Sequence, residues 1–422
     1  MLELSFVRTH TLEVRKNLAR RGNQSFLEMF DELVEKDRCW RELKAEEERL
    51  RCERNRLSDE VNLLKRQGKD ASAVLAKARL LPEKVKKVQA EAALCRQRVD
   101  FLLARLPNLL HESVPDGLDE NENVEVRRWG EPKKPAFALK HHGELAQSRG
   151  LANFSKAVNV AGAGFYYLKG SLALLDFALQ GFAVDFLNRR GYTVVVPPFM
   201  LRRKPYEGVT DLADFENVMY KIDGEDLFLI ATSEHPIAAL HMDEILEAKD
   251  LPLKYCGVSP CFRKEIGKHS IDERGLFRVH QFSKVEQFVF CKPEDSWKMH
   301  EELLGNAEEI IQALGIPYRV MNVCTGDIGT VAAKKYDIEA WSPREGKYFE
   351  IISCSNCTSY QAARLKIRYR KDKGKEFVHT LNSTALATSR IIRAILENFQ
   401  KEDGSVEVPK VLQPLMGGIK VI

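Results

Sequence analysis

A long uninterrupted helical stretch near the amino terminus constrains the fold of this chain more than any other feature. From Ser25 to Gln67 the sequence is rich in Glu, Lys, Arg and Leu and contains neither proline nor glycine, a composition that favours a helix. Within it, leucines recur at every seventh position, at Leu43, Leu50, Leu57 and Leu64. Such a repeat aligns the leucines in one apolar stripe, so we expect this helix to pack against a partner helix.

A second helical run supplies that partner. Gly68-Lys69-Asp70 breaks the first pattern, and helix-forming sequence resumes from about Ala71 to Leu106. We expect Pro82 to start or kink the main part of this helix. Its apolar stripe consists of Val85, Val88, Ala92, Val99 and Leu102. Two long helices joined by a short polar turn predict an antiparallel helical hairpin over about residues 27–101.

The hairpin carries many basic residues, namely Arg51, Arg54, Arg56, Lys65, Arg66, Lys77, Arg79, Lys84, Lys86, Lys87, Arg96 and Arg98. Because acidic residues are mixed among them, two interpretations have equal weight. The basic residues either form an ordinary solvated helix face or follow the phosphates of a nucleic acid.

Length and composition suit a soluble protein of two or three domains. The chain has 422 residues, 30% of them charged, and a net charge of +4, which does not by itself indicate a nucleic-acid partner. Nine scattered cysteines suit a reducing compartment better than a disulfide framework. The first ten residues do not resemble a signal peptide, and the most apolar stretch, 161–187, is interrupted by charges. We therefore expect a cytoplasmic protein, or one imported after removal of a leader, without a membrane span.

Beyond the hairpin, the sequence predicts a connector and a second domain. Prolines punctuate residues 107–160, which we interpret as the connector, and residues 161–422 as a larger domain. Its first helix, Gly170 to Arg190, is apolar nearly all round and so should be buried, in the core or between subunits. Strand-like runs follow without regular strand–helix alternation. They predict an α+β fold with a mostly antiparallel sheet and flanking helices.

The stretch from Arg263 to Gln287 combines strand-like ends with a polar middle bracketed by glycines. Glutamates and aspartates alternate there with arginines and lysines, and residues after Phe277 should alternate between two faces of a strand. Arginine forks bind phosphates well, so this unit could hold a polyphosphate; a charged surface hairpin is the alternative. The sequence contains neither GxxxxGK[ST] nor a GxGxxG after a strand, so any nucleotide would be bound by another scheme.

Other candidate residues are weaker when taken singly. Thr232-Ser233-Glu234 follows a strand and could be a helix cap as well as part of a site. Glu350 and Ser353 lie in one predicted strand, and Arg390 lies early in the last helix. Four cysteines, Cys256, Cys261, Cys354 and Cys357, have only a loose zinc-ligand spacing, so we expect no zinc.

Together these motifs resemble the seryl-tRNA synthetases, which are class II aminoacyl-tRNA synthetases. Three stretches match the class II signatures in order: LDFALQGFAVDFLNRRGYTVVVPPFM, then FRKE with ERGLFRVHQFSKVEQ, then TLNSTALATSRIIRAILENFQ. Within them, TSE, HQFSKVEQ and TLNSTA are specific to the seryl enzymes. The resemblance covers the whole chain and implies an N-terminal tRNA-binding domain over residues 1–106, a class II catalytic domain and a homodimer formed through the first signature.

The resemblance also implies the reaction and its residues. Serine and ATP with Mg²⁺ would give seryl-adenylate, and the seryl group would pass to serine tRNA bound by the helical arm; charging of selenocysteine tRNA stays open. The implied catalytic residues are Arg263, Glu350 and Arg390. The implied serine pocket is Thr232, Ser233, Glu234, Arg263, Glu286 and Thr384. The implied ATP site is Arg263, Lys264, Glu265, Arg274, Val279, Phe282, Glu350, Ile351, Ile352, Ser353 and Arg390, with Glu350 and Ser353 as the Mg²⁺ ligands.

Two alternatives to an active synthetase have to account for the same residues. A catalytically dead relative would be expected to lack one of Arg263, Glu286, Glu350 or Arg390, and all four are present. A coiled-coil RNA-binding protein without catalysis would account for the arm, but it would leave the charged pattern of the second domain without a purpose.

Overall fold

The computed structural model describes residues 3–210, 218–265 and 275–422. The chain divides into two compact units, Leu2–Pro107 and Asn108–Ile422. The first unit is entirely helical among its described residues, and its helices are α1 (Leu4–Thr9), α2 (Thr11–Ala19), α3 (Gln24–Arg66) and α4 (Ser72–Leu103). The predicted helical hairpin is thus confirmed, and the residues before it form two short helices.

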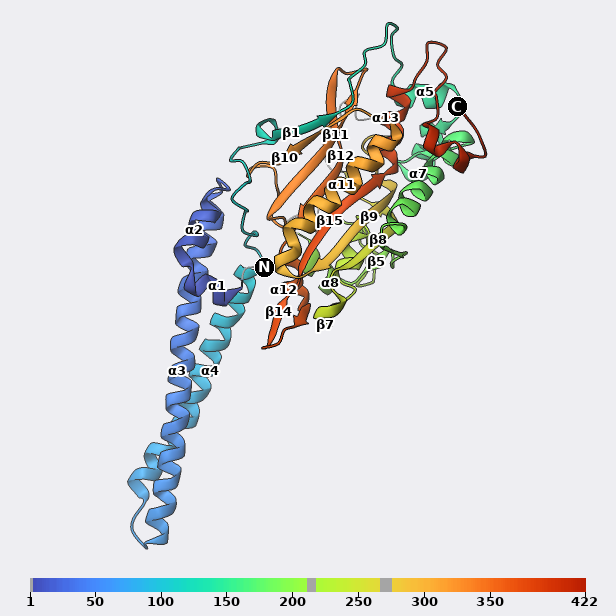
Figure 1. Cartoon of the computed structure of the whole chain (residues 1–422). Coiled ribbons are helices and arrows are strands. Elements are labelled where there is room, and N and C mark those ends of the chain that lie inside the picture. The colour runs from blue at the N-terminus through green and yellow to red at the C-terminus, as the bar shows by residue number, and fades with distance from the viewer. Residues whose placement is uncertain (1–2, 211–217, 266–274) are drawn as a thin grey trace. The chain divides into compact units, whose positions relative to one another are not determined.

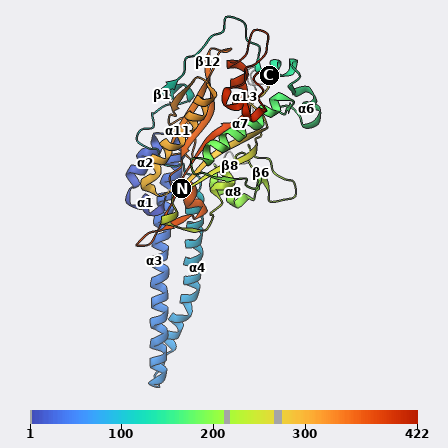
Figure 2. The same cartoon turned by 45° about the vertical axis from the view of Figure 1, so that its right-hand side comes forward.

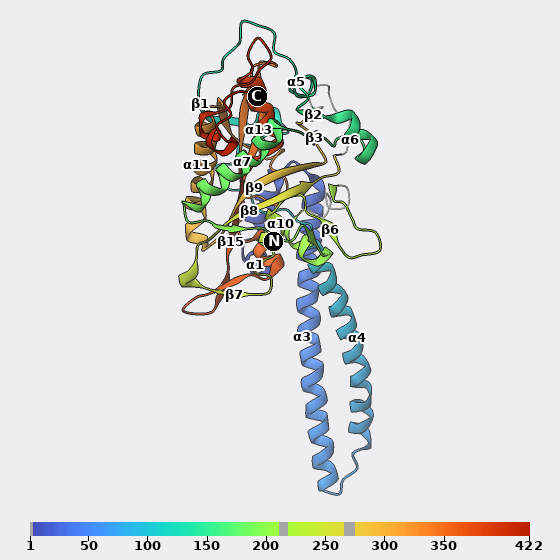
Figure 3. The ribbon, with the colours of Figure 1, turned by 90° about the vertical axis from the view of Figure 1, so that its right-hand side faces the viewer.

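Helices α3 and α4 lie side by side and antiparallel (Figures 1 and 3). The side chain of Asn23 caps α3 by accepting a hydrogen bond from the backbone N–H of Ser25 at 3.0 Å. Gly68, at a φ of +67°, ends the turn after α3, because this backbone conformation suits glycine. The leucine repeat supplies the seam, where Leu50 and Leu57 are buried together with Leu81 and Val85 of α4.

The second unit is built around an eight-stranded sheet with the order β1-β10-β11-β12-β15-β9-β8-β4. All neighbouring strands are antiparallel except β4 and β8, which are parallel, so the predicted α+β fold is confirmed. The strands of this sheet are β1 (Val124–Trp129), β4 (Thr193–Val195), β8 (Leu253–Phe262), β9 (Gln281–Cys291), β10 (Tyr318–Asn322), β11 (Lys334–Ser342), β12 (Lys347–Asn356) and β15 (His379–Ala387).

Smaller strands and helices surround this sheet. The minor strands are β2 (Ala152–Asn153), β3 (Tyr167–Leu168), β5 (Met200–Leu201), β6 (Phe228–Leu229), β7 (Ile245–Glu247), β13 (Arg368–Arg370) and β14 (Lys375–Phe377). The helices are α5 (His142–Ser148), α6 (Phe154–Ala161), α7 (Ser171–Asn188), α8 (Arg203–Val209), α10 (Glu234–Ala238), α11 (Ser296–Leu314), α12 (Tyr360–Leu365) and α13 (Thr388–Asn398). The 3-10 turns are η1 (Glu120–Glu122), η2 (Ala248–Asp250), η4 (Pro293–Asp295), η5 (Lys410–Leu412) and η6 (Pro414–Met416).

The two faces of the large sheet are covered differently. On β9, Val285 and Val289 point into the main hydrophobic core with α7, α11 and α13, and Figures 2 and 3 show α7 beside β8 and β9 with α13 close to it. Phe288 and Phe290 point to the opposite face and pack with α8, α10 and α12 in a smaller cluster. The alternation predicted for β9 is therefore confirmed, and it separates a core face from a second face.

Helix α7 is the one described helix long and apolar enough to span a membrane. Its apolar composition has another cause, because Leu172, Leu175, Leu179 and Leu187 are completely buried in the main core. Its other side leaves Phe177 71% exposed, which matters for assembly below.

Several elements differ from those expected. Strand β11 and helix α11 were not predicted. The TLNSTA motif forms part of strand β15, which ends at Ala387, and α13 begins directly after it at Thr388. The residues interpreted as a connector contribute β1, which pairs with β10 at the edge of the large sheet. The strand expected from Phe277 begins at Gln281.

Candidate active site

A cavity of about 580 Å³ opens on the second face of the sheet, against β9, β12 and β15. It brings together most of the residues proposed from the sequence, although they come from widely separated segments. The predicted residues that line it are Thr232, Glu234, Arg263, Glu265, Val279, Phe282, Glu286, Glu350, Ile351, Ser353, Thr384 and Arg390.

Two β-bulges aim side chains into this cavity. Ile338 of β11 pairs with Ile352 and Glu339 pairs with Glu350, which leaves Ile351 as an extra residue in β12. In β15, Thr384 pairs with Glu286 and Leu386 pairs with Val285, which leaves Ala385 as an extra residue. Each bulge reverses the alternation of faces beyond it, so residues an odd number apart line the same cavity.

A buried carboxylate, Glu286, lies at the inner end of the site. Thr384 Oγ1 donates to Glu286 Oε2 at 3.4 Å, and the ammonium of Lys284 forms an ion pair with the same carboxylate. Glu286 is only 1% exposed. Burial raises the pKa of Glu286, whereas the neighbouring Lys284 charge acts in the opposite direction.

A second carboxylate, Glu234, stands at the start of α10. Gln361 Nε2 and Asn382 Nδ2 donate to its Oε1 at 2.9 and 3.1 Å. Burial, followed by the charge of Glu286, raises the pKa of Glu234 to about 7. A pair of carboxyl groups in one enclosed cavity favours a ligand that brings a positive charge and a hydrogen-bonding hydroxyl or amine.

Two arginines flank these carboxylates and contact aromatic rings. The guanidinium of Arg263 lies 5.3 Å from the ring centre of Phe282, and its Nε donates to the carbonyl oxygen of Ala231 at 3.3 Å. The guanidinium of Arg390 lies 5.0 Å from the ring centre of Phe277. The resemblance to the seryl-tRNA synthetases implies an adenine stacked between Phe282 and Arg390, which stays a prediction, and Phe277 is a second aromatic candidate.

An acidic cluster lies beside Arg390. Arg390 Nη1 donates to the backbone oxygen of Glu350 at 2.8 Å and lies 3.3 Å from its carboxylate. Although burial acts to raise it, the pKa of Glu350 is lowered by the charges of Arg390 and Lys335. Asp337, opposite Ser353 on β11, is buried, and its Oδ1 has no hydrogen-bond partner among the described residues.

Four predicted residues do not contribute to the described lining of the cavity. Ser233 is fully buried against Gly257, since a side chain on that glycine would meet Ser233 Oγ at 2.6 Å. Lys264 and Ile352 follow Arg263 and Ile351 directly, and successive residues of an extended chain point to opposite sides. Arg274 lies outside the described residues.

Several lining residues were missed from the sequence: Val209, Thr210, His235, Phe277, Arg278, Lys284, Ser355, Cys357, Asn382, Ala387 and Ser389, and the segment 328–332. Lys284 and Asn382 could have been found, because they lie within HQFSKVEQ and TLNSTA on the parity of Glu286 and Thr384. The segment 328–332 has no distinguishing pattern, and only the folding of the β10–β11 connection brings it to the site.

The cysteines considered for zinc are all buried and free. Burial raises the pKa of Cys256 to about 12 and also raises those of Cys261, Cys354 and Cys357. The described residues contain no group of three or more His, Cys, Asp or Glu side chains arranged to hold a metal ion.

The mostly antiparallel sheet with an arginine- and carboxylate-lined cavity on one face fits a class II aminoacyl-tRNA synthetase, and the comparisons with known proteins show that class. The family model for the tRNA synthetase class II core domain (G, H, P, S and T) matches residues 218–399. The model for the seryl-tRNA synthetase N-terminal domain matches residues 1–110. The chain belongs to the seryl-tRNA synthetase family.

Full-length relatives and solved structures agree with this assignment. The serine–tRNA ligases of Methanoculleus marisnigri and Methanocella arvoryzae are 58% and 57% identical to this chain, each over 100% of both chains. The crystal structure of seryl-tRNA synthetase from Pyrococcus horikoshii complexed with ATP is 47% identical, with a TM-score of 0.97 over 100% of this chain and 99% of that one. The cytoplasmic serine–tRNA ligase of Naegleria fowleri in complex with AMP is 35% identical, with a TM-score of 0.90 over 97% and 95%.

Proposed function

We propose that this chain is a serine–tRNA ligase that works in two steps in the cavity. A carboxylate oxygen of serine attacks the α-phosphorus of ATP, the bond to the β-phosphate breaks, and pyrophosphate leaves. The 3′-hydroxyl of the terminal adenosine of serine tRNA then attacks the carbonyl carbon of the adenylate, and AMP leaves. The observation that carries the proposal is the enclosed Glu286–Thr384 pair, which lies beside Glu234 and Arg263 in one cavity.

The carboxylates of the cavity suit the two polar ends of serine. Glu234 would accept hydrogen bonds from the serine ammonium, and Glu286 with Thr384 would bind the hydroxyl. Alanine lacks that hydroxyl and would leave buried polar groups unpaired, a penalty that can give discrimination on the order of 10⁴-fold. Threonine keeps the hydroxyl and would have to be rejected by steric exclusion of its extra methyl group.

The arginines would act on ATP by charge and position. Arg263 would hold the α-phosphate, where negative charge builds during attack, and Arg390 would hold the outer phosphates. Arg274 keeps its proposed role on the outer phosphates from the sequence alone. Glu265 and the backbone near Val279 would contact the adenine, and Phe282 would stack on it. No protein nucleophile is required, because serine enters as a carboxylate.

The acidic cluster fits a magnesium ion carried with ATP. Mg²⁺ prefers oxygen ligands and is commonly held by one or two carboxylates together with substrate phosphates. Glu350 and Ser353 offer a carboxylate and a hydroxyl from one strand. Asp337, opposite Ser353 on β11, adds a second carboxylate outside the described lining, with Oδ2 paired to Lys335 at 3.3 Å and Oδ1 without a hydrogen-bond partner among the described residues. When bound there, Mg²⁺ would neutralise the phosphate charge.

The helical arm is proposed to bind serine tRNA. Its exposed basic residues, among them Arg54, Arg56, Lys84 and Lys86, lie along α3 and α4 and can contact phosphates. The name of the family model that matches residues 1–110 supports a role specific to the seryl enzymes.

We also propose a homodimer and a cytoplasmic location. Exposed apolar side chains gather on α7 and on the chain after β4, where Phe177 is 71% and Val196 is 70% exposed. A second copy would cover them. Nine cysteines without a disulfide suit a reducing cytoplasm.

Serine-dependent exchange of pyrophosphate into ATP, run against a panel of amino acids, tests the proposal. Glu286→Ala should abolish exchange with serine, because the carboxylate that selects the hydroxyl is lost. The matched control is Glu308→Ala, a buried carboxylate that pairs with Arg127 and does not belong to the described lining of the cavity. Exchange by Glu286→Ala at normal serine affinity, or wild-type exchange with another amino acid in preference to serine, would contradict the assignment.

A further inference from the structure

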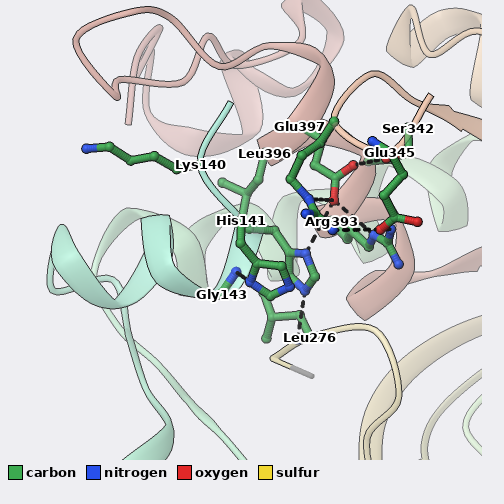
Figure 4. A network of polar contacts seen from close by, with 12 residues as sticks. Lys140, His141, Gly143, Leu276, Ser342, Glu345, Arg393, Leu396 and Glu397 are labelled. Atoms are coloured by element: carbon green, nitrogen blue, oxygen red, sulfur yellow. Dashed lines mark hydrogen bonds and ion pairs between the residues drawn. The ribbon is translucent and has the colours of Figure 1, made fainter. Parts of the chain in front are cut away.

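A buried carboxylate behind the cavity joins two parts of the molecule. Glu397 of α13 accepts hydrogen bonds from Arg393 Nε at 3.0 Å and from Ser342 Oγ at 2.5 Å, and Figure 4 shows these contacts. Its third partner is His142 Nδ1 of α5, at 3.3 Å. Burial acts to raise the pKa of Glu397, but the hydrogen bond from His142 and the charge of Arg393 lower it to about 2. The carboxylate is therefore ionised and can only accept hydrogen bonds.

The other ring nitrogen of His142 contacts the chain that leads into the ATP site. The backbone N–H of Leu276 points to His142 Nε2 at 3.3 Å. A backbone N–H can only donate, so Nε2 must be the acceptor. Nδ1 then carries the proton and donates it to Glu397, which fixes one neutral tautomer of a fully buried imidazole.

Two glycines allow this close approach. Gly275 has a φ of +86°, and a Cβ there would meet His142 Nε2 at 3.0 Å and the Cα of Gly143 at 3.3 Å. A Cβ on Gly143 would in turn meet the Cα of Gly275 at 3.4 Å. The first turn of α5 and the chain at Gly275 are thus packed backbone against backbone.

Glu397 also helps to fix Phe277, the residue after Leu276, through a contact with the side chain of Phe277. Arg393, bound to Glu397 and to Glu345, places its guanidinium 4.5 Å from the ring centre of Phe277. Phe277 meets the ring of Phe349 edge-on, with 5.5 Å between the ring centres. Glu397 therefore fixes Leu276 through His142 and Phe277 through Arg393.

After Leu276, the chain forms one wall of the cavity. Phe277, Arg278 and Val279 all line it, whereas His142 does not belong to its described lining. The chain just before α5 is also bonded to the chain just after α13, because Lys140 N donates to Gln400 Oε1 at 2.9 Å and Gln400 Nε2 donates to the backbone oxygen of Lys140 at 3.2 Å.

From this geometry we infer that His142 is a positioning residue for ATP, which holds the wall formed by Phe277, Arg278 and Val279 through its hydrogen bond to the backbone of Leu276. The inference rests on the proposed role of that wall in binding ATP. It assigns a function in the first step of the reaction to a residue of the segment that precedes the catalytic signatures. His142 acts through the backbone and touches neither substrate.

Two substitutions separate the two hydrogen bonds of His142. In His142→Asn, the amide nitrogen can replace Nδ1 as donor to Glu397, but no acceptor reaches Leu276. In His142→Gln, the amide oxygen can replace Nε2 as acceptor from Leu276, whereas the donor to Glu397 is lost. His142→Asn should raise the KM for ATP in pyrophosphate exchange about tenfold, with the KM for serine within about twofold of wild type. His142→Gln should keep the KM for ATP within about threefold of wild type.

Hydrogen exchange gives a second measurement that requires no turnover. In His142→Asn, the peptide covering residues 275–282 should exchange its amides faster than in wild type and in His142→Gln. His300→Asn is the matched control, since His300 is equally buried, bonds to the backbone oxygen of Cys354 at 3.1 Å and does not belong to the described lining of the cavity. It should lower stability without a selective change in the KM for ATP.

The inference is overturned if His142→Asn leaves both the KM for ATP and the exchange of 275–282 at wild-type values. It is equally overturned if His142→Asn, His142→Gln and His300→Asn impair the enzyme to the same extent, since that pattern indicates general loss of stability. Absence of serine-dependent exchange in the wild-type protein is a separate result. It would overturn the proposed function, while the hydrogen-exchange comparison would still decide whether His142 anchors the wall.

Discussion

Glu350 and Ser353 stand three residues apart on β12 and nevertheless face the same cavity, because Ile351 is an extra residue between them. In a regular strand, residues three apart point to opposite faces. The bulge therefore creates the pair of oxygen ligands that we propose for Mg²⁺, and it depends on the register between β12 and β11.

Replacement of Glu350 by glutamine tests this pair. Glu350→Gln keeps the shape of the side chain but removes its charge, so the Mg²⁺ concentration for half-maximal pyrophosphate exchange should rise by about 10- to 100-fold. Glu339→Gln is the control, because Glu339 pairs with Arg319 at 2.6 Å and does not belong to the described lining of the cavity. An unchanged Mg²⁺ requirement in Glu350→Gln would remove this residue from the metal site.

Serine binding should weaken as the pH falls below about 7. The pKa of Glu234 is raised to about 7 by burial and by the charge of Glu286, so the carboxyl group becomes neutral below that pH and attracts the serine ammonium less. The KM for serine should rise up to tenfold for each pH unit below 7, and Glu234→Gln should show a high KM without this pH dependence. Steady-state exchange kinetics between pH 5.5 and 8.5 measure both.

The contribution of Glu234 to the free energy of unfolding should show the opposite trend with pH. Because the pKa of Glu234 is higher in the folded protein than its ordinary value of 4.5, the folded state binds the extra proton between these two values. Its contribution is fully present below pH 4.5 and is lost as the pH rises through about 7. The free energy of unfolding of wild type relative to Glu234→Gln should thus fall from pH 5 to pH 8, and a rise would contradict the raised pKa.

A methyl group at Gly257 should disturb the serine site selectively. A Cβ there would meet Ile237 Cδ1 at 2.4 Å and Ser233 Oγ at 2.6 Å, so Gly257→Ala must displace the Thr232–Glu234 turn. We expect the KM for serine to rise about tenfold or more, with a smaller effect on the KM for ATP. Gly305→Ala is the control, because nothing lies within 4 Å of its added Cβ on α11. Equal kinetic effects of the two substitutions would argue that the Thr232–Glu234 turn does not position the serine site.

Deletion of the helical arm should separate the two steps of the reaction. A protein lacking residues 27–101, closed by a short flexible linker, should form seryl-adenylate at a near-normal rate, because the described cavity is lined only by residues of the second unit. Charging of serine tRNA should fall by at least about 100-fold, since the phosphate contacts that we propose for α3 and α4 would be lost. Loss of both activities to the same extent would contradict an arm that serves only tRNA.

The sequence predicts best those elements whose pattern is local. The leucine repeat of the first helical run and the apolar stripe of the second identified α3 and α4 to within a few residues, because the spacing that buries Leu50, Leu57 and Val85 can be read along each helix. The alternation in β9 likewise predicted that Glu286 and Val285 point to opposite faces of the sheet, one into the cavity and the other into the main core. By contrast, β11 and β15 were not predicted, and in β15 the reason is that TLNSTALA has no single clear period and both its faces are buried.

The site was predicted less evenly, and the errors have a common cause. Ser233 and Ile352 are adjacent in sequence to lining residues, but both side chains face the packed interior. The turn at Thr232–Glu234 decides the direction of Ser233, and the alternation of strand β12 decides that of Ile352. Asn382, Phe277 and the segment 328–332 line the cavity because chains distant in sequence meet there. Resemblance to the seryl-tRNA synthetases supplied the candidate site residues, whereas their grouping in one cavity required the fold.

The sequence by itself determined the helical hairpin, the α+β class and the set of charged residues, because periodicity, turn residues and motifs are properties of short segments. Only the tertiary structure decided which of those residues share a cavity and what holds them. The bulge at Ile351 arises from pairing between β11 and β12. The anchor of Leu276 arises because His142 of α5 meets Glu397 of α13, 255 residues away along the chain. Such contacts depend on packing between distant segments, which no local pattern records.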